Sequence, residues 1–292
     1  MIDARPAARL KRYAPGLRQP SHAHDGAHLS LVLAGGFCET DSRGAHAIAA
    51  GRTGLRPEGL RHEVRFGAAG AVILTFEPPP RADGRPAVTD PAWSPMLPRA
   101  HLRRLTPMLL EDGEAALEAA WDLLALCDTE PVRPRPDPWL RAVHDQLIEA
   151  PAGARLTGIA HRAGRHRVHL GRAFLAAYGE PPSVFRRRAM LDRALCLKAL
   201  GLPAALAAVD AGFADQSHFA RACRDVYGLP PGRLMARTAQ VAFVQYPDAG
   251  PRQSAAAVPE TPCAAISSPS CPPFRSSQTP PPPPATRSSR RP

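Results

Sequence analysis

The stretch Gly212-Phe-Ala-Asp-Gln-Ser-His-Phe219 decides how this chain is interpreted. Gly212 suits a turn because glycine tolerates a positive φ, and Asp215 can cap a following helix by accepting backbone N–H bonds. Phe219 would then be the inward anchor of that helix. Its outward face would carry the polar side chains Gln216, Ser217, His218 and Arg221. The stretch therefore predicts a turn followed by an amphipathic helix.

A related pattern precedes it, from Ala163 to Phe174. Gly164 is the turn residue here, and Leu170 and Phe174 would face the core because they lie four positions apart. Outward or flanking faces would carry His166, Arg167 and Arg172. In the later unit, the apolar residues around the turn are Leu206, Val209 and Phe213. We therefore expect two helix-turn-helix units in tandem.

Positive charge gathers in the same part of the chain. The formal net charge of the 292 residues is +11, and Lys11 and Lys198 are the only lysines. Between Trp139 and Gln240 there are 14 arginines and one lysine against seven acidic residues, about +8. A GC-rich genome would also replace lysine by arginine, but it would not place the excess here. A basic segment rich in arginine favours nucleic acid as a partner.

Residues Leu156 to Leu234 resemble the C-terminal DNA-binding domain of the AraC/XylS family of bacterial transcription regulators. The matching features are Ile159-Ala160, Gly164, His169-Leu170, Arg172, Phe174, Gly179 with Pro182, Ala194, Gly212-Phe213, Asp215, Ser217-His218-Phe219, Arg221, Gly228 and Pro231. The resemblance implies two helix-turn-helix subdomains joined by a long helix. It also implies DNA contacts from His166, Arg167, Val168, Gly171, Arg172, Gln216, Ser217, His218, Ala220 and Arg221.

Side-chain chemistry agrees with that implication. Arginine and glutamine can pair bidentately with guanine and adenine in the major groove. The helix expected between the units carries Arg186, Arg187, Arg188 and Arg193 and could space the two readers by one turn of DNA, about 34 Å. Gly171 offers no side chain to a base. Ala207, Cys223 and Leu234 are smaller than the family's usual residues, which predicts a less tightly packed second unit.

Four segments are expected along the chain, which we assign to an α+β multidomain fold. Short strands separated by glycines predict a β domain at 1–80, and helical spacing of leucine and alanine predicts a linker, or dimerisation helices, at 99–130. The all-helical double helix-turn-helix domain would occupy 138–238. The tail at 248–292 is rich in Pro and Ser and is expected to be disordered.

The β segment has histidines at a recognisable spacing. Gly16-x5-His22-x-His24-x3-His28-x6-Gly35 and Gly51-x5-Pro57-x-Gly59-x2-His62 resemble the two cupin motifs, with His28 in the place of a glutamate. The resemblance implies a cupin-like barrel whose pocket holds these four histidines. Such a set could bind Zn, Fe, Ni or Cu. We expect an organic effector there and no resident cofactor, with a metal ion as the open alternative. Arg56 and Arg61 could fix an anionic ligand, although solvated positions are the default for both.

We therefore predict a sequence-specific regulator that responds to a small-molecule effector. Its expected partners are double-stranded DNA, the effector, RNA polymerase and, in a homodimer, a second copy. The absence of a leader, of an apolar stretch of about 18 residues and of paired cysteine motifs predicts a cytoplasmic protein that does not enter membranes. No nucleophile–base pair is visible, so an enzyme is not expected. The alternatives are a cupin metalloenzyme with a basic DNA-binding appendage and an architectural DNA binder with an inert β domain.

Overall fold

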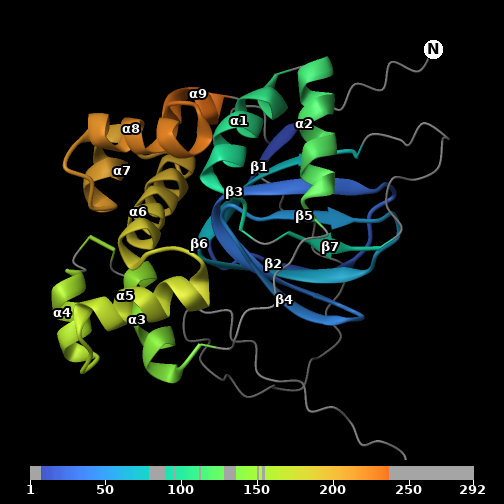
Figure 1. Cartoon of the computed structure of the whole chain (residues 1–292). Helices are drawn as coiled ribbons and strands as arrows, with labels where there is room; N and C mark the ends of the chain where they lie inside the picture. The colour runs from blue at the N-terminus through green and yellow to red at the C-terminus, as the bar shows by residue number, and fades with distance from the viewer. Residues whose placement is uncertain are drawn as a thin grey trace, which may run out of the picture.

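The computed structural model describes residues 8–78, 90–94, 96–111, 113–127, 136–149, 151–152 and 155–236. The predicted tail at 248–292 lies outside these ranges. A β-sheet domain comes first, and two groups of helices follow it, as Figure 1 shows. The broad prediction of an antiparallel β domain followed by an all-helical domain is confirmed.

Seven antiparallel strands form the sheet. They are β1 (Arg9–Tyr13), β2 (Arg18–His22), β3 (His28–Asp41), β4 (Gly44–Ala49), β5 (Thr53–Arg56), β6 (His62–Phe76) and β7 (Ala92–Trp93). The path runs β1-β6-β3-β5-β7, with β2 added to β6 and β4 added to β3. Among the described strands, no pairing joins the path ends β1 and β7, so these strands form an antiparallel sheet for which barrel closure is not shown.

The long central strands β3 and β6 have two apolar faces. On one face, Val32, Phe37, Phe66, Ile73 and Trp93 pack together inside the β domain. On the other face, leucines such as Leu31 and Leu74 pack against helices. Strand side chains alternate between faces, so a nearly continuous apolar run produces a sheet that is buried on both sides.

Two antiparallel helices cover the second face of the sheet (Figure 1). They are α1 (Arg99–Leu110) and α2 (Glu114–Ala125). Leu102, Leu105 and Leu109 of α1 are almost completely buried, as their helical spacing predicts. Gly113 separates the helices and has φ 101°. The two helices and the break near this glycine, which the leucine spacing predicts, are thus present.

The remaining helices carry the two predicted units. They are α3 (Pro138–Glu149), α4 (Leu156–Arg162), α5 (Arg167–Tyr178), α6 (Pro182–Ala199), α7 (Ala204–Asp210), α8 (Gln216–Tyr227) and α9 (Pro231–Met235). The central helix α6 lies between the two groups (Figure 1). Its first turns, at Phe185, belong to a core shared with α3, α4 and α5. Its later residues, from Met190 to Ala199, belong to the core that continues into the β domain.

The second unit and the β domain therefore share one hydrophobic core. Cys223 and Leu234 of this unit are fully buried, and the same core includes leucines of α1 and β3. A Cβ on Gly228 would lie 2.5 Å from the carbonyl oxygen of Arg103, which shows how closely α1 approaches the end of α8. Helix α1 packs against this unit and shares its core, so the small side chains Cys223 and Leu234 are fully buried.

Polar contacts reinforce this junction. The Asp192 carboxylate of α6 accepts a hydrogen bond from the Gly35 backbone N–H of β3. The Tyr227 hydroxyl at the end of α8 donates to the Leu33 carbonyl of the same strand. Arg12 of β1 donates to the Ala199 carbonyl at the end of α6. The second unit is thus held to β3 and β1, whereas the first unit has a separate core.

Candidate nucleic-acid interface and histidine cluster

The first reader helix, α5, follows a glycine turn. Gly164 has φ 62°, a conformation that glycine adopts without strain. The His166 side chain caps α5 by accepting a hydrogen bond from the Val168 backbone N–H at 3.3 Å. Leu170 and Phe174 are buried, as predicted. The opposite face of α5 is therefore the one available to a partner.

Four of the five predicted contact residues of this helix are exposed. They are His166, Arg167, Val168 and Arg172. Val168 is 53% exposed, an unusual position for a large apolar side chain in a folded domain. Gly171 is half-buried on the same helix. An exposed surface of two arginines and one valine can offer hydrogen bonds to guanine and an apolar contact to a thymine methyl group.

The second reader helix, α8, is positioned more tightly. Gly212 has φ 94°, and a Cβ there would lie 2.5 Å from the Ala152 Cβ, so both backbone and space require glycine. The Asp215 carboxylate caps α8 by accepting from the His218 backbone N–H at 2.7 Å. Phe219 is completely buried. The predicted turn, cap and anchor of this unit are confirmed.

The outward residues of α8 are not all equally available. Gln216, Ser217 and Arg221 are exposed, while His218 and Ala220 are half-buried. The His218 ring packs edge-on against Phe213, with 5.1 Å between centroids. Three polar side chains, rather than four, are therefore exposed on the outward face of α8.

Helix α7 differs from its sequence pattern. Leu206 and Val209 are 60% and 62% exposed, whereas Ala207, Ala208 and Ala211 face the core and are fully buried. The apolar character of Leu206 and Val209 therefore does not mark the buried face of this unit. Ala208 and Ala211 instead pack in the same core as Phe213 and the later residues of α6.

The arginines of α6 fall into different environments. Arg188 contacts Glu180 at 2.7 Å, and Arg193 contacts Asp210 at 2.9 Å, so both charges are partly neutralised. Arg186 is half-buried and Arg187 is exposed. Arg187 is thus the member of this set whose surroundings best suit a phosphate contact.

The β domain brings its predicted histidines together. His22 ends β2 and His62 begins β6, and these two residues are register partners. Ring centroids are 4.5 Å apart for His22 and His62 and 5.2 Å apart for His24 and His62. One ligand nitrogen from each of His22, His24 and His62 lies within 4.8 Å of the others. His28 is adjacent, with its ring 4.5 Å from that of His24, but lies outside this group of three.

Burial favours the neutral form of three imidazoles in this group, those of His24, His28 and His62. Desolvation, reinforced by the neighbouring His62, lowers the pKa of His24 to about 4. Desolvation and the Arg56 guanidinium lower the pKa of His28 to about 2. The pKa of His62 is also lowered by burial, against the opposing charge of Glu39. Neutral imidazoles have a lone pair that can accept a hydrogen bond or bind a metal.

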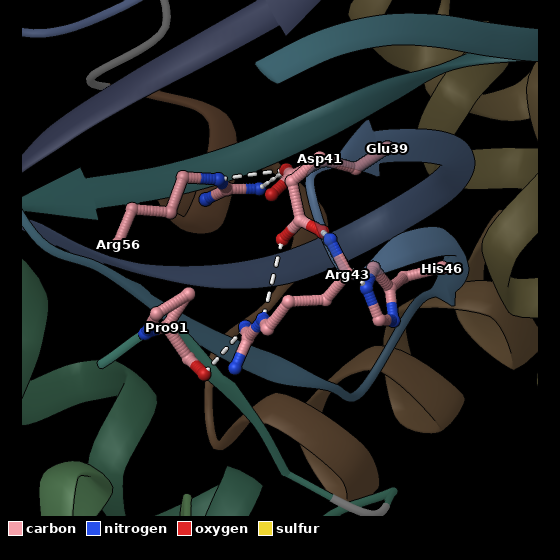
Figure 2. A network of polar contacts seen from close by, with 6 residues as sticks. All are labelled: Glu39, Asp41, Arg43, His46, Arg56 and Pro91. Atoms are coloured by element: carbon pink, nitrogen blue, oxygen red, sulfur yellow. Dashed lines mark hydrogen bonds and ion pairs between the residues drawn. The ribbon is translucent and has the colours of Figure 1, made fainter. Parts of the chain in front are cut away.

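An ion pair is buried beside the histidines. Arg56 donates to Glu39 from both Nε and Nη2 (Figure 2). It also donates to the Ser30 hydroxyl. Arg56 is 5% exposed, and its guanidinium carbon lies 4.5 Å from the centre of the Trp93 ring. The solvated position expected for Arg56 is therefore wrong, while Arg61 is exposed as expected. The sequence did not indicate the burial of Arg56, because no local pattern marks Glu39 as the residue that pairs with it.

Near the β3–β4 turn, a second polar group surrounds the buried carboxylate of Asp41. Arg43 contacts Asp41 at 3.7 Å and donates to the Pro91 carbonyl at 2.7 Å (Figure 2). His46 lies 3.5 Å from the same carboxylate. These contacts fasten the turn to the segment before β7. They involve none of the clustered histidines, which agrees with the absence of His46 from both motifs.

Comparison with known proteins gives one family match. Residues 143–237 match the helix-turn-helix domain family. No curated protein matches the chain. Within the described residues, the helices are too short or too polar to cross a membrane.

Structure comparison matches the chain to solved proteins from several bacteria. ToxT from Vibrio cholerae has 9% identity and a TM-score of 0.35, over 80% of this chain and 98% of that chain. An AraC-type transcriptional regulator from Chromobacterium violaceum has 24% identity and a TM-score of 0.33, over 35% and 94%. A DNA-binding transcriptional dual regulator from Escherichia coli K-12 has 23% identity and a TM-score of 0.32, over 38% and 99%.

Proposed function

We infer that this chain is a DNA-binding transcription regulator of the AraC type, because residues 143–237 match the helix-turn-helix domain family and carry two helix-turn-helix units. The observation that carries this conclusion is the pair α5 and α8. Each follows a glycine turn, each is capped by a side chain, and each presents an exposed polar face. Helices of this kind insert into the major groove of double-stranded DNA.

We propose specific roles for the exposed side chains. Arg172 of α5 and Arg221 of α8 would each donate two hydrogen bonds to a guanine, and Gln216 would pair with an adenine. Val168 would contact a thymine methyl group. His166, Arg167, Gly171, Ser217 and His218 complete the proposed DNA-facing set. Arg187 of α6 would bind phosphate, a contact that positions the protein without reading sequence.

The β domain is proposed to be the sensory domain. In this proposal the sheet forms a cupin-like barrel in residues 1–80, and His22, His24, His28 and His62 face its ligand. A ToxT structure from Vibrio cholerae with 10% identity and a TM-score of 0.35, over 82% of this chain and 98% of that chain, is described as bound to an unsaturated fatty acid. For this chain, the support comes from the clustered histidines themselves, which lie near the buried ion pair of Arg56 and Glu39.

The shared core suggests how a ligand would act on DNA binding. Strand β3 starts at His28, passes the contacts of Leu33 and Gly35 to α8 and α6, and continues to Glu39. A ligand at the histidines would shift β3 and with it the second reader, while the first reader keeps its own core. The relative placement of the two readers would then depend on the ligand, by no more than its difference in affinity for the two states.

Other parts of the proposal concern partners. Residues 99–130 would be the linker and could support a homodimer, since Trp121 of α2 is 41% exposed. RNA polymerase is the expected partner at a promoter, and the cytoplasm is the expected compartment. Residues 138–238 would be the DNA-binding domain.

Genome-wide mapping of bound sites, followed by binding assays on the most enriched site, tests the proposed function. Arg172→Ala and Arg221→Ala should each lower affinity for that site. Arg18→Ala is the matched control, because Arg18 is an exposed arginine of the β domain away from both readers. Equal affinity of all three variants and the wild-type chain would refute the assignment of α5 and α8 as readers.

A further inference from the structure

An open hollow lies between the second reader helix and the first linker helix. Its volume is about 410 Å³, and it is lined by Arg99, Ala100 and Arg103 of α1 and by Asp225 of α8. The two helices are close together here, because a Cβ on Gly228 at the end of α8 would lie 2.5 Å from the Arg103 carbonyl oxygen (Figure 1). They also share one hydrophobic core. Helix α1 is therefore a fixed neighbour of the second reader.

The hollow begins one helical turn from Arg221, the arginine proposed to read a guanine. Asp225 lies four positions after Arg221, and side chains four positions apart lie on the same side of a helix, with about 5–6 Å between their Cβ atoms. Arg221, Arg224 and Asp225 are all exposed. A DNA strand that passes beside Arg221 would therefore reach the hollow within one turn of α8.

The positive charge of the hollow is available to a partner. Arg99 and Arg103 are exposed, and within the described part of the chain neither guanidinium is in an ion pair. Arg104, on the same helix, differs from them because it pairs with Asp122 of α2. With Arg221 and Arg224 of α8, the surface has four arginines against one aspartate, so positive charge is in excess.

The phosphate backbone of DNA is the partner that fits this surface. A duplex has one negative charge for about every 1.7 Å of its axis, and a guanidinium can donate two parallel hydrogen bonds to a phosphate. Arg99 and Arg103 lie four positions apart, so both side chains extend from the same side of α1. The surface is also continuous with the exposed face of α8, which is proposed to enter the major groove.

We propose that Arg99 and Arg103 of α1 bind phosphates of the DNA that α8 reads. The interface would then extend beyond residues 143–237, which match the helix-turn-helix family, onto the linker. This inference rests on the proposed function, because it takes double-stranded DNA as the partner. Phosphate contacts add affinity and fix orientation without reading sequence. DNA would thus hold α8 together with α1, a helix that shares its core with the β domain.

The salt dependence of DNA binding by the full chain tests this proposal. Affinity for a duplex that carries the mapped site is measured by fluorescence anisotropy at several salt concentrations. The logarithm of the binding constant falls linearly with the logarithm of the salt concentration, with a slope of about 0.9 for each neutralised phosphate. A double variant, Arg99→Ala with Arg103→Ala, should therefore have a slope that is shallower than that of the wild-type chain by about 1.8. It should also bind all sequences more weakly.

Arg104→Ala is the matched control, because Arg104 is an exposed arginine of the same helix that already has an acidic partner. It should keep the wild-type slope. Arg103→Lys should also keep that slope, because lysine supplies a positive charge to a phosphate. The proposal is wrong if the double variant has the wild-type slope, or if Arg104→Ala lowers the slope as much as the double variant does.

A gain of affinity guards against misfolding as an explanation. The Asp225 carboxylate would repel a phosphate in the hollow, so Asp225→Asn should raise affinity for all sequences alike. Loss of the fold cannot produce that result. An affinity that stays the same or falls would contradict the placement of a phosphate beside Asp225.

Neutral methylphosphonate groups, placed one at a time along the mapped site, locate the contacts. At least one position should weaken binding by the wild-type chain and by Arg104→Ala but not by the double variant. That position is the phosphate that α1 holds. If the double variant responds to every position as the wild-type chain does, α1 holds no phosphate.

Arg221→Ala on the same duplex separates this inference from the proposed function. If Arg221→Ala weakens specific binding while the double variant keeps the wild-type slope, only the role of α1 is refuted. If neither Arg221→Ala nor Arg172→Ala weakens binding to the mapped site, the proposed readers fail, and the inference about α1 fails with them.

Discussion

Asp192 links the DNA-binding part of the chain to the sheet, and its replacement by asparagine should change how stability depends on pH. Its carboxylate lies between α6 and β3 and accepts the Gly35 N–H. Burial raises the pKa of Asp192 to about 6, although the Gly35 hydrogen bond and the Arg188 charge act in the opposite direction. Asparagine keeps an oxygen for the Gly35 bond but has no charge to desolvate.

The size of the effect follows from the pKa change. A carboxyl group whose pKa is higher in the folded chain binds its proton more tightly there than in the unfolded chain. The free energy of unfolding therefore falls as pH rises from about 4 to about 6, and it stays low above that range. The rise of the Asp192 pKa from an ordinary value of 3.8 to about 6 is roughly two pKa units. This rise corresponds to a loss of at most about 3 kcal/mol in the free energy of unfolding. At pH 7.5, the Asp192→Asn variant should therefore have a free energy of unfolding that is higher than that of the wild-type chain by up to that amount.

Urea unfolding at several pH values between 4 and 7.5 measures this difference. The lowered pKa values of His24, His28 and His62 give the opposite slope, because protonation of these residues favours the unfolded chain as pH falls below about 6.5. Their contribution is the same in both proteins and cancels in the difference between them. The variant should be more stable at pH 7.5 and nearly equal to the wild-type chain at pH 4.

Asp210→Asn is the matched control. Asp210 is an exposed carboxylate of α7 that pairs with Arg193, so its loss should change stability by no more than about 1 kcal/mol. If Asp192→Asn is no more stable than the wild-type chain at pH 7.5, or if the difference between them does not vary with pH, the reasoning about this buried carboxylate is wrong.

Four further outcomes are expected. Arg172→Ala and Arg221→Ala should each weaken specific binding by about 1–3 kcal/mol in anisotropy assays if each contacts a guanine, and an unchanged affinity would contradict that role. Arg187→Ala should weaken binding to all sequences alike and flatten the salt dependence; a loss confined to certain base pairs would rule out a phosphate contact. Gly212→Ala should cost about 2–4 kcal/mol in chemical unfolding, because a positive φ and the nearby Ala152 both exclude a Cβ, and a neutral result would show that the turn can relax. Removal of residues 248–292 should leave specific affinity unchanged, whereas a collapse would assign the tail a role in binding.

Local signals predicted the helix-turn-helix units well. Gly164, Gly212 and Asp215 act through turns and caps that depend on neighbouring residues, so the sequence indicates them directly. The burial of Leu170 and Phe219 follows from helical spacing in the same way. Short-range chemistry was therefore sufficient to place both reader helices.

Contacts between distant segments were not visible in the sequence. The Glu39–Arg56 pair depends on the pairing of β3 with β5, and Tyr227 meets Leu33 across 194 residues. The apolar Leu206 and Val209 are exposed because the neighbouring helices, rather than helical periodicity, decide which side of α7 is buried. No local pattern reports where a helix from another segment will pack, so the shared core of the second unit and the β domain could not be predicted.

Hydroxyl-radical footprinting of the full chain on its mapped site tests the paired readers most directly. We predict two protected patches whose centres lie about one helical turn, or roughly 10 base pairs, apart. Arg172→Ala should reduce protection mainly in one patch and Arg221→Ala mainly in the other. A single patch, or two patches that both variants leave intact, would contradict the conclusion that α5 and α8 enter DNA together.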